Sequence, residues 1–154
     1  MVGRSKNINM FLMDGEVTGK IKCTLSNWTG VIYKIPHIQL ADLKSRDEMK
    51  QSGIYFLFGR DEDKQKDATY IGQATTRKNG EGVLLRVQEH TRDTHADYFN
   101  DVIILTTQNN SFGPTEISYL ENKFTQLAKE SGRFIVKNSN EPNSGNVTEE
   151  KVSE

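Results

Sequence analysis

The chain of 154 residues contains a single cysteine, three prolines and no long run of apolar side chains. One cysteine, Cys23, excludes an internal disulfide framework and any zinc site built from several cysteines. No apolar segment approaches the roughly 18 residues that a membrane-spanning helix needs, and the first residues make a poor secretory signal. We therefore expect a cytoplasmic protein without a membrane partner.

The sequence also lacks a net charge of either sign. Its 20 Lys and Arg residues stand against 21 Asp and Glu residues, which gives a formal charge of −1. Residues 139–154 hold four glutamates, one lysine and almost no apolar side chain, so the rest of the chain is mildly basic. This composition predicts a disordered acidic tail or a linker to a further domain. A near-zero total therefore does not exclude a polyanionic partner.

Three short apolar segments near the N-terminus predict a small β-meander: 8–14, 16–25 and 30–35. The dipeptide Asp14-Gly15 is a strong signal for a tight hairpin turn between the first two. A weak helical period follows over 40–50. We interpret residues 1–50 as a β-rich extension that packs on a separate core.

The region 51–138 alternates predicted strands and helices. Short apolar runs predict strands over 53–58, 68–73, 101–106 and 134–137. Helical signals cover 83–92 and 115–130. The longer helix has an apolar face made by Ile117, Leu120, Phe124, Leu127 and Ala128. The pattern predicts an α/β (α+β) fold, in which a small antiparallel sheet is flanked by helices.

Two tyrosines lie on the two strands of the hairpin predicted in this core. They belong to the triplets Gly53-Ile54-Tyr55 and Tyr70-Ile71-Gly72. Side chains on one face of an antiparallel pair lie about 5–8 Å apart, so Tyr55 and Tyr70 could face a common site. Taken alone, they are also ordinary strand-forming aromatic residues.

Charged residues on the predicted helices are further candidates. Arg86 and His90 are four residues apart, which places them on one face of the helix over 83–92. Such a face is often simply solvated, although an arginine beside an apolar stripe commonly has an anionic partner. Glu116 and Glu121 flank the apolar face of the longer helix, where a carboxylate suits either a metal ion or a salt bridge.

The two triplets, in this order, spell the name of the GIY-YIG nuclease family, which the chain resembles over roughly residues 52–140. That family continues with an arginine on the next helix and a histidine four residues later, and Arg86 and His90 match both. Glu121 matches a glutamate on a later helix, and Asn138 matches an asparagine that follows a short strand. The resemblance implies a GIY-YIG-like core at 51–138 with a β-meander extension before it.

The resemblance also implies an activity. Members of the family are metal-dependent endonucleases that hydrolyse DNA phosphodiester bonds by a one-metal, in-line mechanism, in restriction, repair or mobile elements. Glu121 would hold one Mg²⁺ or Mn²⁺, since Mg²⁺ often takes only one or two protein carboxylates beside water and phosphate. Arg86 would neutralise charge on the phosphate, with Gly72 and Asn138 also contributing to the substrate site.

The resemblance assigns the proton transfer to the aromatic residues. Tyr55 would be the general base, Tyr70 would orient water or phosphate, and His90 could accept the proton from Tyr55. A free tyrosine has a pKa of about 10, so Arg86, the metal or His90 would have to favour the phenolate. The alternative is a catalytically silent module of the same fold that binds nucleic acid or protein. The presence of the whole residue set favours the enzyme.

Overall fold

The structure is a computed structural model that describes residues 3, 5–75, 82–90 and 98–140. These residues form an α+β fold around a seven-stranded mixed sheet of spatial order β1-β2-β3-β6-β4-β5-β7. The strands, in chain order, are β1 (Ile8–Leu12), β2 (Ile21–Leu25), β3 (Gly30–Pro36), β4 (Gly53–Asp61), β5 (Lys66–Ala74), β6 (Phe99–Thr107) and β7 (Ile135–Val136). The predicted acidic tail lies outside the described residues from 141 onward.

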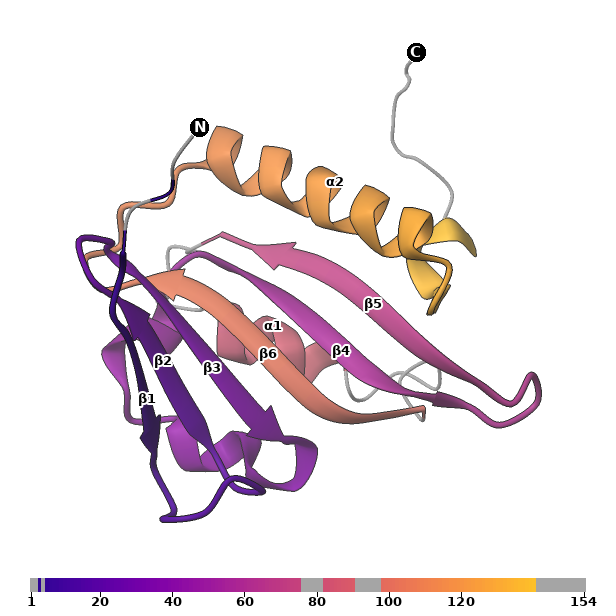
Figure 1. The fold of residues 1–154 in the computed structure, drawn as a ribbon, viewed down its shortest axis with the longest axis horizontal. Helices are drawn as coiled ribbons and strands as arrows, with labels where there is room; N and C mark the ends of the chain where they lie inside the picture. Colours follow the sequence, from indigo (N-terminus) through magenta and orange to yellow (C-terminus); the bar gives the residue numbers. More distant parts are fainter. Residues whose placement is uncertain (1–2, 4, 76–81, 91–97, 141–154) are drawn as a thin grey trace.

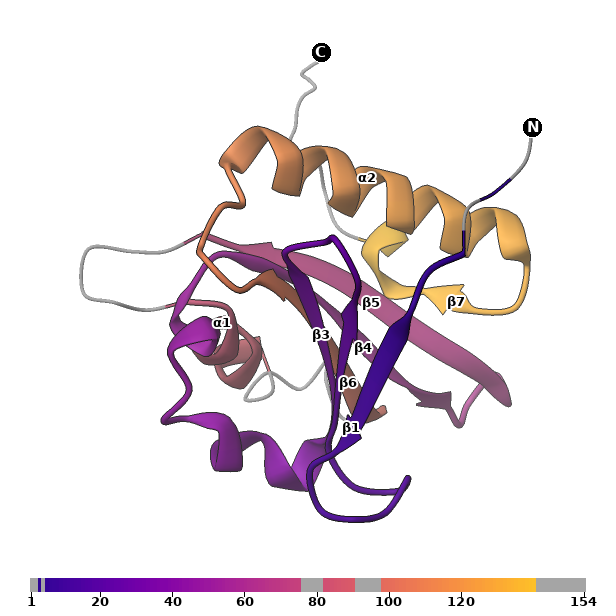
Figure 2. The same cartoon turned by 60° about the vertical axis from the view of Figure 1, so that its left-hand side comes forward.

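Helices cover the two faces of the sheet unequally. The helix α1 (Val83–His90) lies on one face, and the longer α2 (Pro114–Ser131) crosses the other face over β4 and β5 (Figures 1 and 2). Short 3₁₀ helices complete the described elements: η1 (His37–Leu43), η2 (Asp47–Lys50) and η4 (Lys137–Asn140). No helix in the described ranges is long and apolar enough to span a membrane.

Strand alternation produces a separate apolar core on each face. Tyr55 and Leu57 of β4 pack on the α1 face, together with Val83 and Val87 of α1. The intervening Ile54 packs on the opposite face with buried or half-buried residues of β5, β6 and α2: Ile71, Leu105, Ile117, Leu120 and Phe124. Because successive residues of a strand point to opposite faces, each strand of the β4–β5 hairpin contributes to both cores.

The ends of α2 follow from its sequence. Gly113 precedes the helix in an extended conformation and Pro114 occupies its first turn, where a missing N–H leaves no bond unmade. The helix ends at Gly132, which adopts the left-handed conformation with φ of 69° that glycine tolerates best. Leu127, predicted on the buried face, is exposed instead, because at about 100° per residue it lies at the edge of the apolar stripe.

Three predictions for the N-terminal region and the sheet need correction. The predicted tight hairpin is a longer connection over 13–20, in which Asp14 accepts hydrogen bonds from both the backbone and the side chain of Lys20. The predicted helix over 40–50 is replaced by η1 and η2, which bury Leu40, Leu43 and Met49. The sheet is mixed because β7 pairs in parallel with β5.

The N-terminal strands continue the same sheet as the core. β3 pairs with β6 along its whole length, and β2 and β1 follow outward in antiparallel pairings. The opposite side of the sheet is completed by β5 and the short β7. The strands β1, β2 and β3 therefore extend the hydrogen-bonded sheet that carries the candidate site.

Candidate functional site

The two candidate tyrosines come together on the α1 face of the β4–β5 hairpin. Tyr55 pairs with Gly72, and Leu57 pairs with Tyr70, so the tyrosines are diagonal neighbours across the two strands. Their ring centroids are 6.3 Å apart, with the rings stacked. Diagonal neighbours on one face lie within reach of aromatic side chains, which explains why the two triplets place their tyrosines together.

His90, the last residue of α1, completes this aromatic group. Its Nδ1 lies 3.2 Å from the hydroxyl oxygen of Tyr55, a distance that fits a hydrogen bond. Its ring also packs edge-on against Tyr70, with 4.3 Å between centroids. Tyr55 is 1% exposed and His90 is 9% exposed, whereas Tyr70 is half-buried. We refer to Tyr55, Tyr70 and His90 as the tyrosine–histidine cluster.

Gly72 makes room for this cluster. A Cβ atom added at Gly72 would lie 2.8 Å from Cε1 of Tyr55 and closer still to its Cζ and hydroxyl oxygen. No real Cβ atom tolerates such contacts, so any larger residue would displace the Tyr55 ring. The requirement for glycine in the second triplet is therefore steric, because the Tyr55 ring occupies the space that a side chain at Gly72 would need.

Arg86 precedes His90 by one turn of α1, as the spacing predicts. Its side chain is 40% exposed, and Nη1 lies 3.7 Å from Glu89 on the same helix. An exposed pair of this kind contributes little stability, and it leaves the guanidinium free to bind an anion. The anionic partner expected for this arginine is thus Glu89, three residues later on the same helix.

Glu121 is joined to the hairpin through a residue that the sequence did not single out. Gln73 donates from Nε2 to Oε1 of Glu121, at 2.7 Å. Gln73 pairs with Ile54, so its side chain lies on the α2 face, opposite the face of Tyr55. The structure therefore brings Glu121 to the same end of β5 as the tyrosine–histidine cluster, but over the other face of the sheet.

Asn138 supports the outer edge of β5. It donates from Nδ2 to the carbonyl oxygen of Ile71 at 2.6 Å and accepts from the N–H of Ile71 at 2.9 Å. The side-chain amide of Asn138 thus makes the two hydrogen bonds that a paired residue of a neighbouring strand would make, at a position beyond the short β7. The geometry gives Asn138 a role in holding the second triplet in place.

The segment that carries Asn138 is anchored to the far end of the hairpin. Lys137 donates to Asp61 at 2.8 Å. This hydrogen bond, with a second one from the backbone of Lys64, holds the pKa of the Asp61 carboxyl below its ordinary value of 3.8. η4 is therefore fixed to both ends of the β4–β5 hairpin.

The donor set at Glu121 is a single carboxylate. Within the described ranges, no group of three or more His, Cys, Asp or Glu side chains is arranged to hold a metal ion. Glu121 is half-buried and accepts a hydrogen bond from Gln73, and a single carboxylate fits a magnesium ion that keeps most of its water until a phosphate arrives. Glu116, the second carboxylate considered, is exposed in the first turn of α2.

Comparisons with protein-family models, with curated proteins and with solved structures give no match to this chain.

Proposed function

We propose that the protein is a metal-dependent DNA endonuclease of the GIY-YIG type. One observation supports this most strongly: the hydroxyl of Tyr55 lies within hydrogen-bond distance of His90, and Tyr70 packs against the same imidazole. A triplet that matched the family by chance would give no reason for a histidine to lie beside Tyr55. The two triplets and the helix after them meet in one group of titratable side chains, which suits proton transfer.

The cluster provides a route for the proton of an attacking water. Tyr55 can pass its hydroxyl proton to Nδ1 of His90 when that nitrogen is unprotonated, and can then accept a proton from water. The exposed guanidinium of Arg86 can neutralise charge that develops on the equatorial phosphate oxygens. Tyr70, which is less buried than Tyr55, is placed to orient the water or the phosphate.

Glu121 would hold one Mg²⁺ or Mn²⁺, which when bound supplies positive charge for the leaving oxygen. Because Glu121 and the tyrosine–histidine cluster lie over opposite faces, the substrate site must lie at the outer edge of β5, near Gly72 and Gln73. One feature suits this edge: in the described structure β7 pairs with Ala68 and Thr69, so its pairing does not reach Gly72 or Gln73. DNA would thus bind along the edge of the sheet.

In this proposal residues 51–138 form the nuclease core, and residues 1–50 form a β-meander that extends its sheet. The competing function is a silent module of the same fold that binds nucleic acid or protein. The burial of Tyr55 favours this second function, because a buried phenol can be a purely structural partner of His90.

Cleavage of supercoiled plasmid separates the two functions. With Mg²⁺ or Mn²⁺ we expect nicked and linear products, with activity that rises above pH 7 and disappears on addition of EDTA. Glu121→Gln should abolish cleavage while preserving the contact with Gln73, and Glu116→Gln should cut like the wild type because Glu116 is exposed. Absence of metal-dependent cleavage, or equal loss in both variants, would refute the proposal.

A further inference from the structure

The strand β1 forms one edge of the sheet, and the outward-facing backbone groups of Ile8 and Met10 have no strand partner among the described residues. The carbonyl of Asn7 accepts a hydrogen bond from the N–H of Ser26, and the N–H of Met13 donates to the carbonyl of Lys20. The odd-numbered residues of this segment, such as Asn7 and Met13, therefore turn their backbone polar groups toward β2. Because this orientation alternates in an antiparallel pair, Ile8, Met10 and Leu12 turn theirs outward. The sheet order places no described strand on that side.

This edge has none of the usual features that prevent strand pairing. Exposed edges are commonly protected by charged residues, prolines or bulges, and β1 contains none of these within Ile8–Leu12. Three of its five side chains are instead apolar and exposed: Ile8 is 66% exposed, Met10 60% and Phe11 57%. Such a strand is suited to pairing with another strand rather than to remaining solvated.

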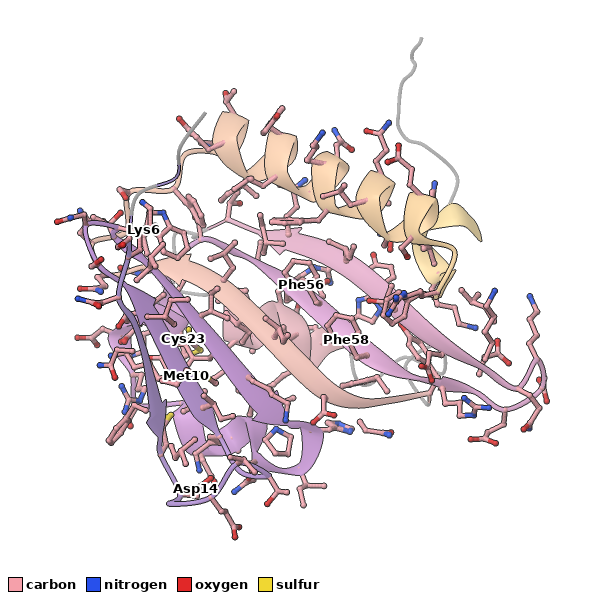
Figure 3. The ribbon with its side chains drawn as sticks, in the orientation of Figure 1. Lys6, Met10, Asp14, Cys23, Phe56 and Phe58 are labelled. Atoms are coloured by element: carbon pink, nitrogen blue, oxygen red, sulfur yellow. The ribbon has the colours of Figure 1, made fainter. Side chains whose placement is uncertain are left out.

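The charges at the two ends of β1 are opposite. Lys6 precedes the strand, and Asp14 follows it at the other end, beyond the apolar residues (Figure 3). Asp14 is fixed by two hydrogen bonds from Lys20, whose ammonium also contacts Asp42 at 3.2 Å. Two carboxylates against one ammonium leave this end of the strand negative.

These features are self-complementary when β1 pairs antiparallel with another β1. Centring the pairing on Met10 places Met10 opposite Met10, Ile8 opposite Leu12, and Lys6 opposite Asp14. All outward-facing residues then fall in hydrogen-bonded pairs. The carbonyl of Leu12 already accepts a hydrogen bond from the N–H of Gly15. About four of the backbone hydrogen bonds between the two β1 strands do not involve that carbonyl.

We propose that β1 is a homodimerisation edge, at which two copies of this chain pair antiparallel about Met10 and join their sheets into one. The apolar side chains of Ile8, Met10 and Leu12 would then contact their counterparts on one face. The cysteine beside Met10 on β2, Cys23, lies on that same face (Figure 3). The inference is independent of the nuclease activity, because it concerns the edge of the sheet most distant from β5.

Sedimentation velocity over micromolar to millimolar concentrations tests this proposal. The wild type should show a reversible monomer–dimer equilibrium. Met10→Pro removes an outward N–H without touching the bonds to β2, and should weaken the dimer at least about tenfold, whereas Met10→Leu should not. Circular dichroism checks that both variants stay folded. A monomeric wild type, or a Met10→Pro dimer of unchanged affinity, would overturn the proposal.

A pair of charge variants tests the orientation. Lys6→Glu should weaken the dimer because it would face Asp14 of the partner, while Lys123→Glu changes the net charge equally on the exposed side of α2. The register is tested in a Cys23→Ser background with a short bismaleimide. Met10→Cys should cross-link to itself, whereas Ile8→Cys should cross-link only when mixed with Leu12→Cys. Equal cross-linking of Ile8→Cys alone would exclude this register.

Discussion

Replacement of Tyr55 by phenylalanine separates a catalytic phenol from a structural one. The variant keeps the ring but removes the hydroxyl that lies 3.2 Å from Nδ1 of His90. A hydrogen bond between neutral groups contributes about 1 kcal/mol to stability, which corresponds to a decrease in Tm of about 2–4 °C for a chain of this size. A domain stable by about 5–15 kcal/mol stays folded at 25 °C after such a loss. Removal of a general base, in contrast, lowers the rate by about 10²–10⁴-fold.

Tyr33 provides the matched control for this experiment. It is also fully buried, on β3, and its hydroxyl donates to Oε2 of Glu48 at 2.6 Å. Hydrogen bonds to charged groups contribute about 1.5–3 kcal/mol, so Tyr33→Phe should destabilise the protein as much as Tyr55→Phe, or more. Because Tyr33 lies outside the candidate site, plasmid cleavage should continue in this variant.

The comparison uses thermal unfolding for stability and initial rates of plasmid nicking at saturating Mg²⁺ for activity. We expect Tyr55→Phe to lose at least about a hundredfold in rate with a small change in Tm. Equal rates for Tyr55→Phe and the wild type would refute the role of Tyr55. Equal loss of activity in both phenylalanine variants would show that the assay reports stability rather than chemistry.

Three further predictions concern the surroundings of the cluster. Gly72→Ala should destabilise the protein by about 1–3 kcal/mol and abolish cleavage, because the added methyl group would collide with the Tyr55 ring; denaturant unfolding with wild-type stability would contradict this. Arg86→Ala should stop cleavage while changing stability by less than about 1 kcal/mol, since its pair with Glu89 is exposed; Glu89→Gln, measured by the same nicking and unfolding assays, should keep the activity. Asp61→Asn should lower Tm above pH 3.8, and this difference should disappear at more acidic pH: the pKa of Asp61 is lowered in the folded protein, so its stabilisation is lost as pH falls through that value. A difference in Tm that stays constant with pH would contradict the ionic role of Asp61.

Most elements of the fold were predictable where a strong local signal was present. The strands predicted over 53–58 and 68–73 lie within β4 and β5, and the helix predicted over 115–130 lies within α2. The segment 40–50 was wrong in type because its apolar period is too short to distinguish an α-helix from 3₁₀ turns. The connection after Asp14 was wrong because its conformation depends on Lys20, a tertiary contact that no turn signal contains.

The candidate site could be predicted only in part. Alternation along two paired strands was enough to bring Tyr55 and Tyr70 together, and helical spacing was enough to place His90 one turn from Arg86. The contact between His90 and Tyr55 required the packing angle of α1 on the sheet, which no spacing specifies. The partner of Glu121 was missed for the same reason, since Gln73 is unremarkable in the sequence.

The face on which each residue lies changes what the residue set can do. Gly72 and Gln73 are adjacent on β5. Gly72 lies against Tyr55 on one face of the sheet, and Gln73 donates a hydrogen bond to Glu121 on the other face. A phosphodiester that contacts both must therefore cross the edge of β5 rather than lie in a pocket on either face. The hydrogen bonds of Asn138 to Ile71 hold η4 against this edge, one residue before Gly72. Asn138→Ala should consequently lower the cleavage rate, because the edge of β5 would no longer be held in position. The loss of rate should be smaller than in Tyr55→Phe, whereas the loss of stability should be larger.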